Sequence, residues 1–148
     1  MVYKRRISLE RNEAELFLSG GRKPGKCSQI VDEISYFVMF YGQLYPKVMI
    51  SYDREAFYDR ADKSFRITFD ENILWRQEEV SLGKEIYGQR ILKPGLALME
   101  IKTGNALPLW LVKILSDEKI YRTTFSKYGS AYIQMIGKHE EGGCRHVG

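Results

Sequence analysis

Two short segments of the chain alternate apolar and polar residues with the period of two that is typical of a β-strand. They are residues 65–70 (FRITFD) and residues 97–102 (ALMEIK). A third segment, residues 48–54, places Tyr52 and Arg54 on one face of a strand. If the three strands are neighbours, their polar faces merge into one surface of Arg, Lys, Tyr and Glu. Such a surface would suit a polyanion and a metal ion.

The remaining segments predict a mixture of helices and strands. The strand–turn–strand order between residues 47 and 76 favours antiparallel pairing and therefore an α+β fold. Within it, residues 70–72 are expected to form a turn that separates two strands. The expected strands are residues 2–9, 47–57, 65–70, 73–76, 90–92 and 96–103, and the expected helices are residues 10–18, 28–45, 108–115 and 130–136.

Composition excludes several classes of protein. The 148 residues fit one domain, and a hydrophobic fraction of 44% argues against disorder. The net charge of +4 permits an anionic partner, but there is no dense basic cluster of the kind expected for a nucleic-acid binder. No apolar run is long enough for a transmembrane helix, and the basic segment at residues 1–6 lacks the apolar region of a signal peptide, so we expect neither. Cys27 and Cys144 have no metal-site spacing, so we expect free thiols in the cytoplasm.

The charged residues on the predicted strands have ordinary alternatives. A lone Arg54 would normally be a solvated residue of an edge strand, but Arg66 and Thr68 repeat the pattern one hairpin away, and several arginines can hold a polyphosphate. Glu100 lies in a very apolar run, so it needs either a cation from a neighbouring strand or a metal ion such as Mg²⁺ or Mn²⁺. Asp70 is interpreted as a turn or capping residue.

Four motifs, in order, resemble the vacuolar transporter chaperone (VTC) domain. Residues 50–57 (ISYDREAF) resemble its YxR strand, and residues 65–70 (FRITFD) its RITFD strand. Residues 98–102 (LMEIK) resemble its LMEIK strand, followed by residues 108–111 (PLWL). Residues 125–129 (FSKYG) resemble its FSKYG element. The family belongs to the triphosphate tunnel metalloenzymes, which are related to the CYTH proteins.

The resemblance implies an antiparallel β tunnel with flanking helices, whose polar face points inward. It also implies synthesis of inorganic polyphosphate from ATP or another nucleoside triphosphate, with Mn²⁺ or Mg²⁺ as cofactor. Glu100 would hold the metal, and Tyr52 and Ser126 would assist. The residues that would contact phosphates are Lys4, Arg6, Arg54, Arg66, Lys102 and Lys127.

In the family, several strands precede the segment that residues 3–9 resemble. We therefore expect residues 1–137 to be the C-terminal part of a tunnel domain, followed by a flexible tail over residues 138–148. Such a chain would form an incomplete, open barrel, and its exposed sheet edges would favour a homodimer.

Two alternatives to an active polymerase follow. The chain could be a non-catalytic module that binds polyphosphate or inositol phosphates, which needs the basic residues but not Glu100. It could also be an inactive truncated remnant whose polar face only pairs in a dimer.

Overall fold

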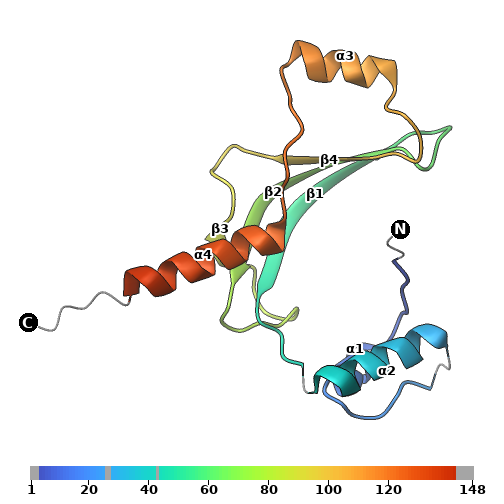
Figure 1. Ribbon diagram of the computed structural model, residues 1–148, viewed down its shortest axis with the longest axis vertical. Helices are drawn as coiled ribbons and strands as arrows, with labels where there is room; N and C mark the ends of the chain where they lie inside the picture. Colours follow the sequence, from blue (N-terminus) through green and yellow to red (C-terminus); the bar gives the residue numbers. More distant parts are fainter. Residues whose placement is uncertain (1–3, 26–27, 43, 143–148) are drawn as a thin grey trace, which may run out of the picture. The chain divides into compact units, whose positions relative to one another are not determined.

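The structure is a computed structural model that describes residues 4–25, 28–42 and 44–142, with side chains to residue 137 (Figure 1). Cys27 and Cys144, which are predicted to be free thiols, lie outside the described residues. The chain divides into two compact units, residues 1–47 and residues 48–148. Each unit is described by itself below.

The first unit contains two helices, α1 (Arg11–Leu18) and α2 (Gln29–Tyr41). Helix α2 begins where Ser28 caps it, because the Ser28 Oγ accepts a hydrogen bond from the backbone N–H of Val31 (3.4 Å). It ends at Gly42, whose φ of 70° breaks the helical repeat, and so it does not reach residue 45 as expected.

The strand predicted for residues 2–9 is wrong for the part that is described, since residues 4–10 have no regular secondary structure. The described residues of the first unit form helices and no strand, so this segment has no pairing partner among them, and Arg5 instead forms an exposed ion pair with Glu33 of α2.

The second unit is built on an open antiparallel sheet with two helices. Within the described residues its elements are β1 (Met49–Tyr58), β2 (Arg66–Arg76), β3 (Gln89–Arg90), β4 (Leu98–Lys102), α3 (Leu109–Asp117) and α4 (Lys127–Gly142). Strand β2 is central: β1 pairs with one of its edges, and β3 and β4 pair in turn with the other. The expected mixed fold is thus confirmed, as an open sheet that does not close into a tunnel (Figure 1).

The strand register places the predicted polar residues on one face of the sheet. Directly opposed residues share a face in an antiparallel pair. The three rows across β1, β2 and β4 are Arg54–Asp70–Leu98, Ala56–Thr68–Glu100 and Tyr58–Arg66–Lys102. We call this the site face. The opposite face carries the rows Glu55–Phe69–Met99 and Phe57–Ile67–Ile101.

The predicted turn at residues 70–72 is wrong, because β2 is one continuous strand from Arg66 to Arg76. Asn72 adopts a positive φ of 47°, and the register with β1 shifts between Ser51 and Asp53. These are the marks of a β-bulge, which kinks a strand without reversing it. Asp70 is therefore in the middle of a strand and not at a turn.

Helix α4 lies on the site face beside this bulge. Trp75 of β2 is buried and donates its indole N–H to Gln134 of α4, and Ala131 of the same helix is 0% exposed. The helix starts earlier than predicted, at Lys127, because Ser126 caps it: the Ser126 Oγ accepts from the N–H of Gly129 (3.1 Å). This early start brings Lys127 onto the sheet.

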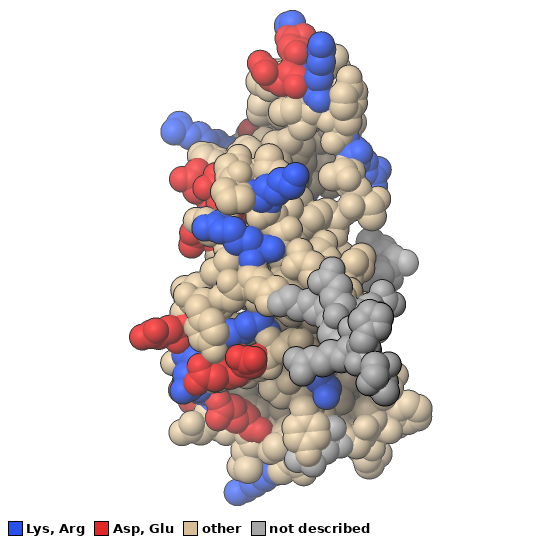
Figure 2. All heavy atoms as spheres, turned by 90° about the vertical axis from the view of Figure 1, so that its left-hand side faces the viewer, with Lys and Arg blue, Asp and Glu red and all other residues tan. Residues whose placement is uncertain are grey.

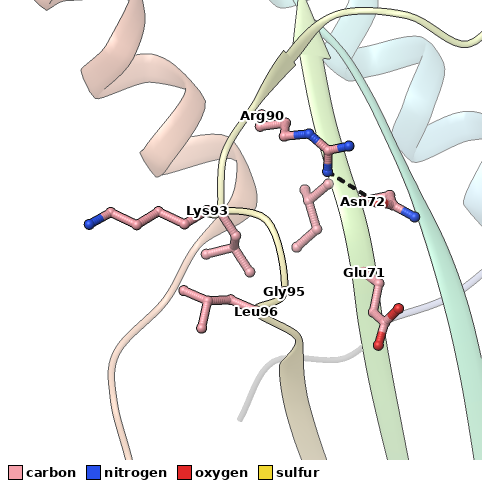
Figure 3. Close-up of a pocket in the computed structure, with 8 residues that line it drawn as sticks. Glu71, Asn72, Arg90, Lys93, Gly95 and Leu96 are labelled. Carbon is pink, nitrogen blue, oxygen red and sulfur yellow. Dashed lines mark hydrogen bonds between the residues drawn. The ribbon is translucent and has the colours of Figure 1, made fainter.

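A small hollow of about 90 Å³ lies where the chain leaves β3 and returns as β4 along the edge of β2. Arg90 reaches across it and donates from Nη1 to the Asn72 Oδ1 (3.0 Å), whereas Lys93 points away (Figure 3). The lining of the hollow shares no residue with the site-face rows defined above.

Arg76, the last residue of β2, organises the loop that follows it. Its buried guanidinium donates to the backbone carbonyls of Glu78, Glu79, Glu85 and Tyr87 at 3.0–3.3 Å, and it lies 4.3 Å from the centre of the Tyr87 ring. One side chain thus supplies the donors that hold residues 78–87 against the sheet.

We predict that Arg76→Leu lowers the free energy of unfolding by about 1–3 kcal/mol, because the partly buried carbonyls lose their donors. Urea denaturation measures this. The matched control is Arg122→Leu, at an exposed position, which should change stability by less than about 0.5 kcal/mol. Equal effects of the two substitutions would contradict the role given to Arg76.

Candidate phosphate-binding site

A fully buried carboxylate stands at the centre of the charged cluster. Asp70 is 0% exposed and receives two hydrogen bonds from Arg54 of β1, from Nε to Oδ1 (2.5 Å) and from Nη2 to Oδ2 (2.7 Å). Lys127 of α4 places its Nζ 2.5 Å from the Asp70 Oδ2. One carboxylate therefore joins the first strand, the second strand and the last helix.

These contacts keep Asp70 ionised. The hydrogen bonds from Arg54, and then the ammonium of Lys127, hold the pKa of the Asp70 carboxyl below its ordinary value, although burial alone would raise that pKa. The hydrogen bonds between Arg54 and Asp70 in turn raise the pKa of the Arg54 guanidinium. A buried carboxylate is tolerated only when cations and hydrogen bonds compensate for its lost hydration, and here both are present.

The ring of Tyr52 lies against both cations. The Arg54 guanidinium carbon is 5.0 Å from the ring centre, and the Lys127 ammonium is 4.6 Å from it. Both distances fall within the range of a cation–π contact. Tyr52 thus confines the two cations from one side while Asp70 binds them from another.

Glu100 lies on the site face between two cations. Its Oε1 is 3.1 Å from the Lys102 Nζ, and its Oε2 is 4.0 Å from the Arg54 Nη2. Glu100 thus has cationic partners, which is one of the two expected alternatives, although Arg54 lies on β1, which β2 separates from β4. The Glu100 side chain remains 41% exposed, so a ligand can reach its oxygens.

A second group of cations lies further along the same face. Arg66 is directly opposite Lys102 in the register, and its guanidinium donates to the Tyr58 hydroxyl (3.4 Å) above the Tyr58 ring. Arg66 and Asp70 are four positions apart on β2, which corresponds to about 13 Å between their Cα atoms at about 3.3 Å per residue. The site face therefore presents cations at two places along the strands.

The structure brings together Tyr52, Arg54, Arg66, Glu100, Lys102 and Lys127 in the second unit. Ser126 lies next to Lys127, but its hydroxyl oxygen caps α4. Lys4 and Arg6 belong to the first unit, where both residues are exposed.

Sequence reasoning missed Asp70 as a member of the site. The residues after it, Glu71 and Asn72, have high turn propensity, and this suggested that the strand ended there. The available signal was the continuation of apolar residues to Trp75. A single strand through this region would have placed Asp70 in the middle of the hairpin with Arg54.

The cations of the cluster outnumber its carboxylates. Arg54, Arg66, Lys102 and Lys127 face Asp70 and Glu100, which leaves a net charge of +2. On the molecular face drawn in Figure 2, lysines and arginines are interspersed with acidic residues. The residues that the structure describes contain no group of three or more His, Cys, Asp or Glu side chains placed to hold a metal ion.

Comparison with known proteins identifies one matching family. The chain matches the VTC domain family over residues 1–136. Searches of curated proteins and of solved structures gave no match.

The lowered pKa of Asp70 predicts acid sensitivity. In the unfolded chain Asp70 takes up a proton near its ordinary pKa of about 3.9, whereas in the folded chain it stays ionised to lower pH. The unfolded state thus binds more protons in this range, so the stability from this group is present at neutral pH and is lost as pH falls below about 5. Urea denaturation between pH 7 and pH 3.5 should show this decline, and Asp70→Asn should flatten it. Identical pH profiles would refute the assignment.

Proposed function

Because this chain belongs to the VTC domain family, which is generally associated with polyphosphate and with metal dependence, we propose that its site face binds inorganic polyphosphate and supports phosphoryl transfer from a nucleoside triphosphate. The observation that carries the proposal is the gathering of Arg54 and Lys102 around Glu100, on strands whose register is set by the sheet, with Lys127 of α4 bound to Asp70 beside Arg54.

In this proposal the cations bind the polyphosphate chain at two points. Arg54 and Lys127 form one contact point, and Arg66 and Lys102, in a row further along the strands, form the second, with Glu100 between Arg54 and Lys102. A linear polyanion can extend along the site face and contact both points at once. Arginine offers planar pairs of donors to phosphate oxygens, and lysine offers a compact charge.

In the proposed reaction an oxygen at the end of the polyphosphate chain forms a new P–O bond to the γ-phosphorus of the nucleotide. The bond between that phosphorus and the β–γ bridging oxygen breaks, and the nucleoside diphosphate leaves with the electron pair. The chain grows by one phosphate. Arg54, Lys102 and Lys127 lower the barrier by stabilising the negative charge on the transferred group.

The donor set fits a magnesium or manganese ion that is shared with the substrate. Such ions commonly bind through one or two carboxylates together with phosphate oxygens and water, and Glu100 offers one accessible carboxylate beside the phosphate-binding cations. Bound there, the ion would neutralise phosphate charge. Glu100 would hold it, and Lys102 would orient the Glu100 side chain through the 3.1 Å contact.

The other predicted site residues have supporting roles in the proposal. Tyr52 supports Arg54 and Lys127 through its ring, Ser126 places Lys127 by starting α4, and Lys4 and Arg6 supply phosphate contacts.

We place the protein in the cytoplasm. We also propose a homodimer through the open edges of the sheet, because unpaired strand edges readily pair with another chain. Among the described residues, no helix combines the length and the apolar character that crossing a lipid bilayer requires.

A binding module without catalysis is the second candidate. It is favoured by the pairing of Glu100 with Lys102 and Arg54, because this carboxylate then has cationic partners without a metal ion. In this case the site face would hold polyphosphate or inositol phosphates and transfer nothing.

Polyphosphate binding tests the part that both candidates share. Arg54→Gln and Lys127→Gln should each weaken the binding of a defined-length polyphosphate about 10-fold or more, since each removes charge-assisted hydrogen bonds. Isothermal titration calorimetry at low salt measures the affinity. The control is Lys113→Gln on α3, which removes the same charge from a side chain that is paired with Asp117. Affinities equal to wild type in both site variants would refute phosphate binding at this face.

Glu100→Gln separates catalysis from binding. If the domain transfers phosphoryl groups, this variant should lose metal-dependent conversion of nucleoside triphosphate to polyphosphate and still bind polyphosphate within a few-fold of wild type. Product formation is followed by ³¹P NMR with Mn²⁺ or Mg²⁺ present. Equal turnover in wild type and variant would contradict the role of Glu100, whereas binding without turnover in wild type would favour the binding module.

A further inference from the structure

We infer that Asp70 is a positioning residue of this site, which fixes the orientation of Arg54 and Lys127 so that their remaining donors face the bound phosphates. This inference rests on the proposed function of the site face. It assigns a role to a buried acid that lies among phosphate-binding cations. An acid at this place is unexpected, because its negative charge opposes the binding of an anion.

The geometry of Arg54 shows how the orientation is set. Asp70 accepts from Nε and from Nη2, which is a two-point contact that fixes the plane of the guanidinium. Nη1 lies on the side of the group turned away from this carboxylate. The Arg54 side chain is 32% exposed, whereas Asp70 is 0% exposed, so the accessible part of the pair is cationic.

Lys127 is held in a similar way. Its ammonium contacts Asp70 at 2.5 Å and the Tyr52 ring at 4.6 Å, and its side chain is 19% exposed. An ammonium group has three donors, so a donor remains for a ligand besides those directed at Asp70 and at the Tyr52 ring. Without the carboxylate, two cations would approach each other closely and repel. Asp70 therefore offsets their repulsion while the protein is free of ligand.

Charge and geometry make opposite predictions for the loss of this acid. If Asp70 acted only through its charge, its removal would raise the positive charge of the site and tighten the binding of an anion. If it positions Arg54 and Lys127, its removal releases both side chains and weakens binding. Partners that orient binding residues in this way typically contribute 10- to 100-fold to affinity at metal sites, and we expect an effect on the order of 10-fold here.

The experiment compares Asp70→Asn with Asp53→Asn by calorimetry, using a polyphosphate of defined length at fixed ionic strength. Asp53 is the matched control because it lies next to Arg54 on β1 with its side chain bonded to Asn72, and its substitution removes the same charge. We expect Asp70→Asn to bind about 10-fold more weakly and Asp53→Asn to bind as wild type or slightly more tightly. Binding by Asp70→Asn that equals or exceeds that of wild type overturns the positioning role.

A double-variant cycle distinguishes the positioning role from a general loss of structure. In the Arg54→Gln background the guanidinium is absent, so the further effect of Asp70→Asn should shrink at least several-fold. Fully additive effects of the two substitutions overturn the inference. A wild-type protein that binds no polyphosphate overturns the proposed function itself, whereas normal wild-type binding with an unaffected Asp70→Asn overturns only the positioning role.

If Asp70→Asn does not fold, the Arg54 side chain can be observed directly in the wild-type protein. The Nε–H group should give a sharp NMR signal that persists when polyphosphate is added, because its bond to Asp70 is retained while other donors bind the ligand. If the Nε–H signal is broadened away by exchange with water both before and after polyphosphate is added, Asp70 does not hold Arg54. That result overturns the inference.

Discussion

The second unit depends on one interaction, the binding of a fully buried aspartate by an arginine and a lysine from two other elements. Asp70 lies on the central strand, Arg54 on its hairpin partner and Lys127 at the start of the last helix. A carboxylate in this position is stable only with both cations in place, since one partner alone would leave part of its lost hydration uncompensated. The contact therefore determines where α4 meets the sheet as well as where the cations lie.

This arrangement connects the fold with the proposed chemistry. The sheet sets the order and spacing of the charged rows, and α4 adds a cation that no strand supplies. The interior of the cluster is neutralised by Asp70, while the parts of Arg54 and Lys102 that solvent can reach remain cationic. A polyanion thus meets donors that are already oriented, so that little ordering of side chains remains to be done when it binds.

Much of the face could be predicted from sequence, because alternation in a strand depends on local geometry alone. Residues 65–70 and 98–102 alternate cleanly, and their polar residues do share one face. The bulge at Asn72 could not be predicted, because Asp, Glu and Asn in succession are equally suited to a turn. The contact of Lys127 with Asp70 joins segments far apart in the chain, and a short polar motif carries no information about such a partner. The strand expected at residues 2–9 is wrong over its described part for a related reason, since residues 4–9 have no strand to pair with among the described residues of their unit.

The central claim is that one face of the sheet binds phosphate chains, and methyl NMR tests it most directly. Ala56 and Thr68 carry methyl groups on the site face, whereas Ile67, Met99 and Ile101 carry them on the opposite face. When polyphosphate is added, the account predicts chemical-shift changes at Ala56 and Thr68 that saturate with ligand, and much smaller changes at the other three. Changes of equal size on both faces, or changes confined to the opposite face, would contradict it.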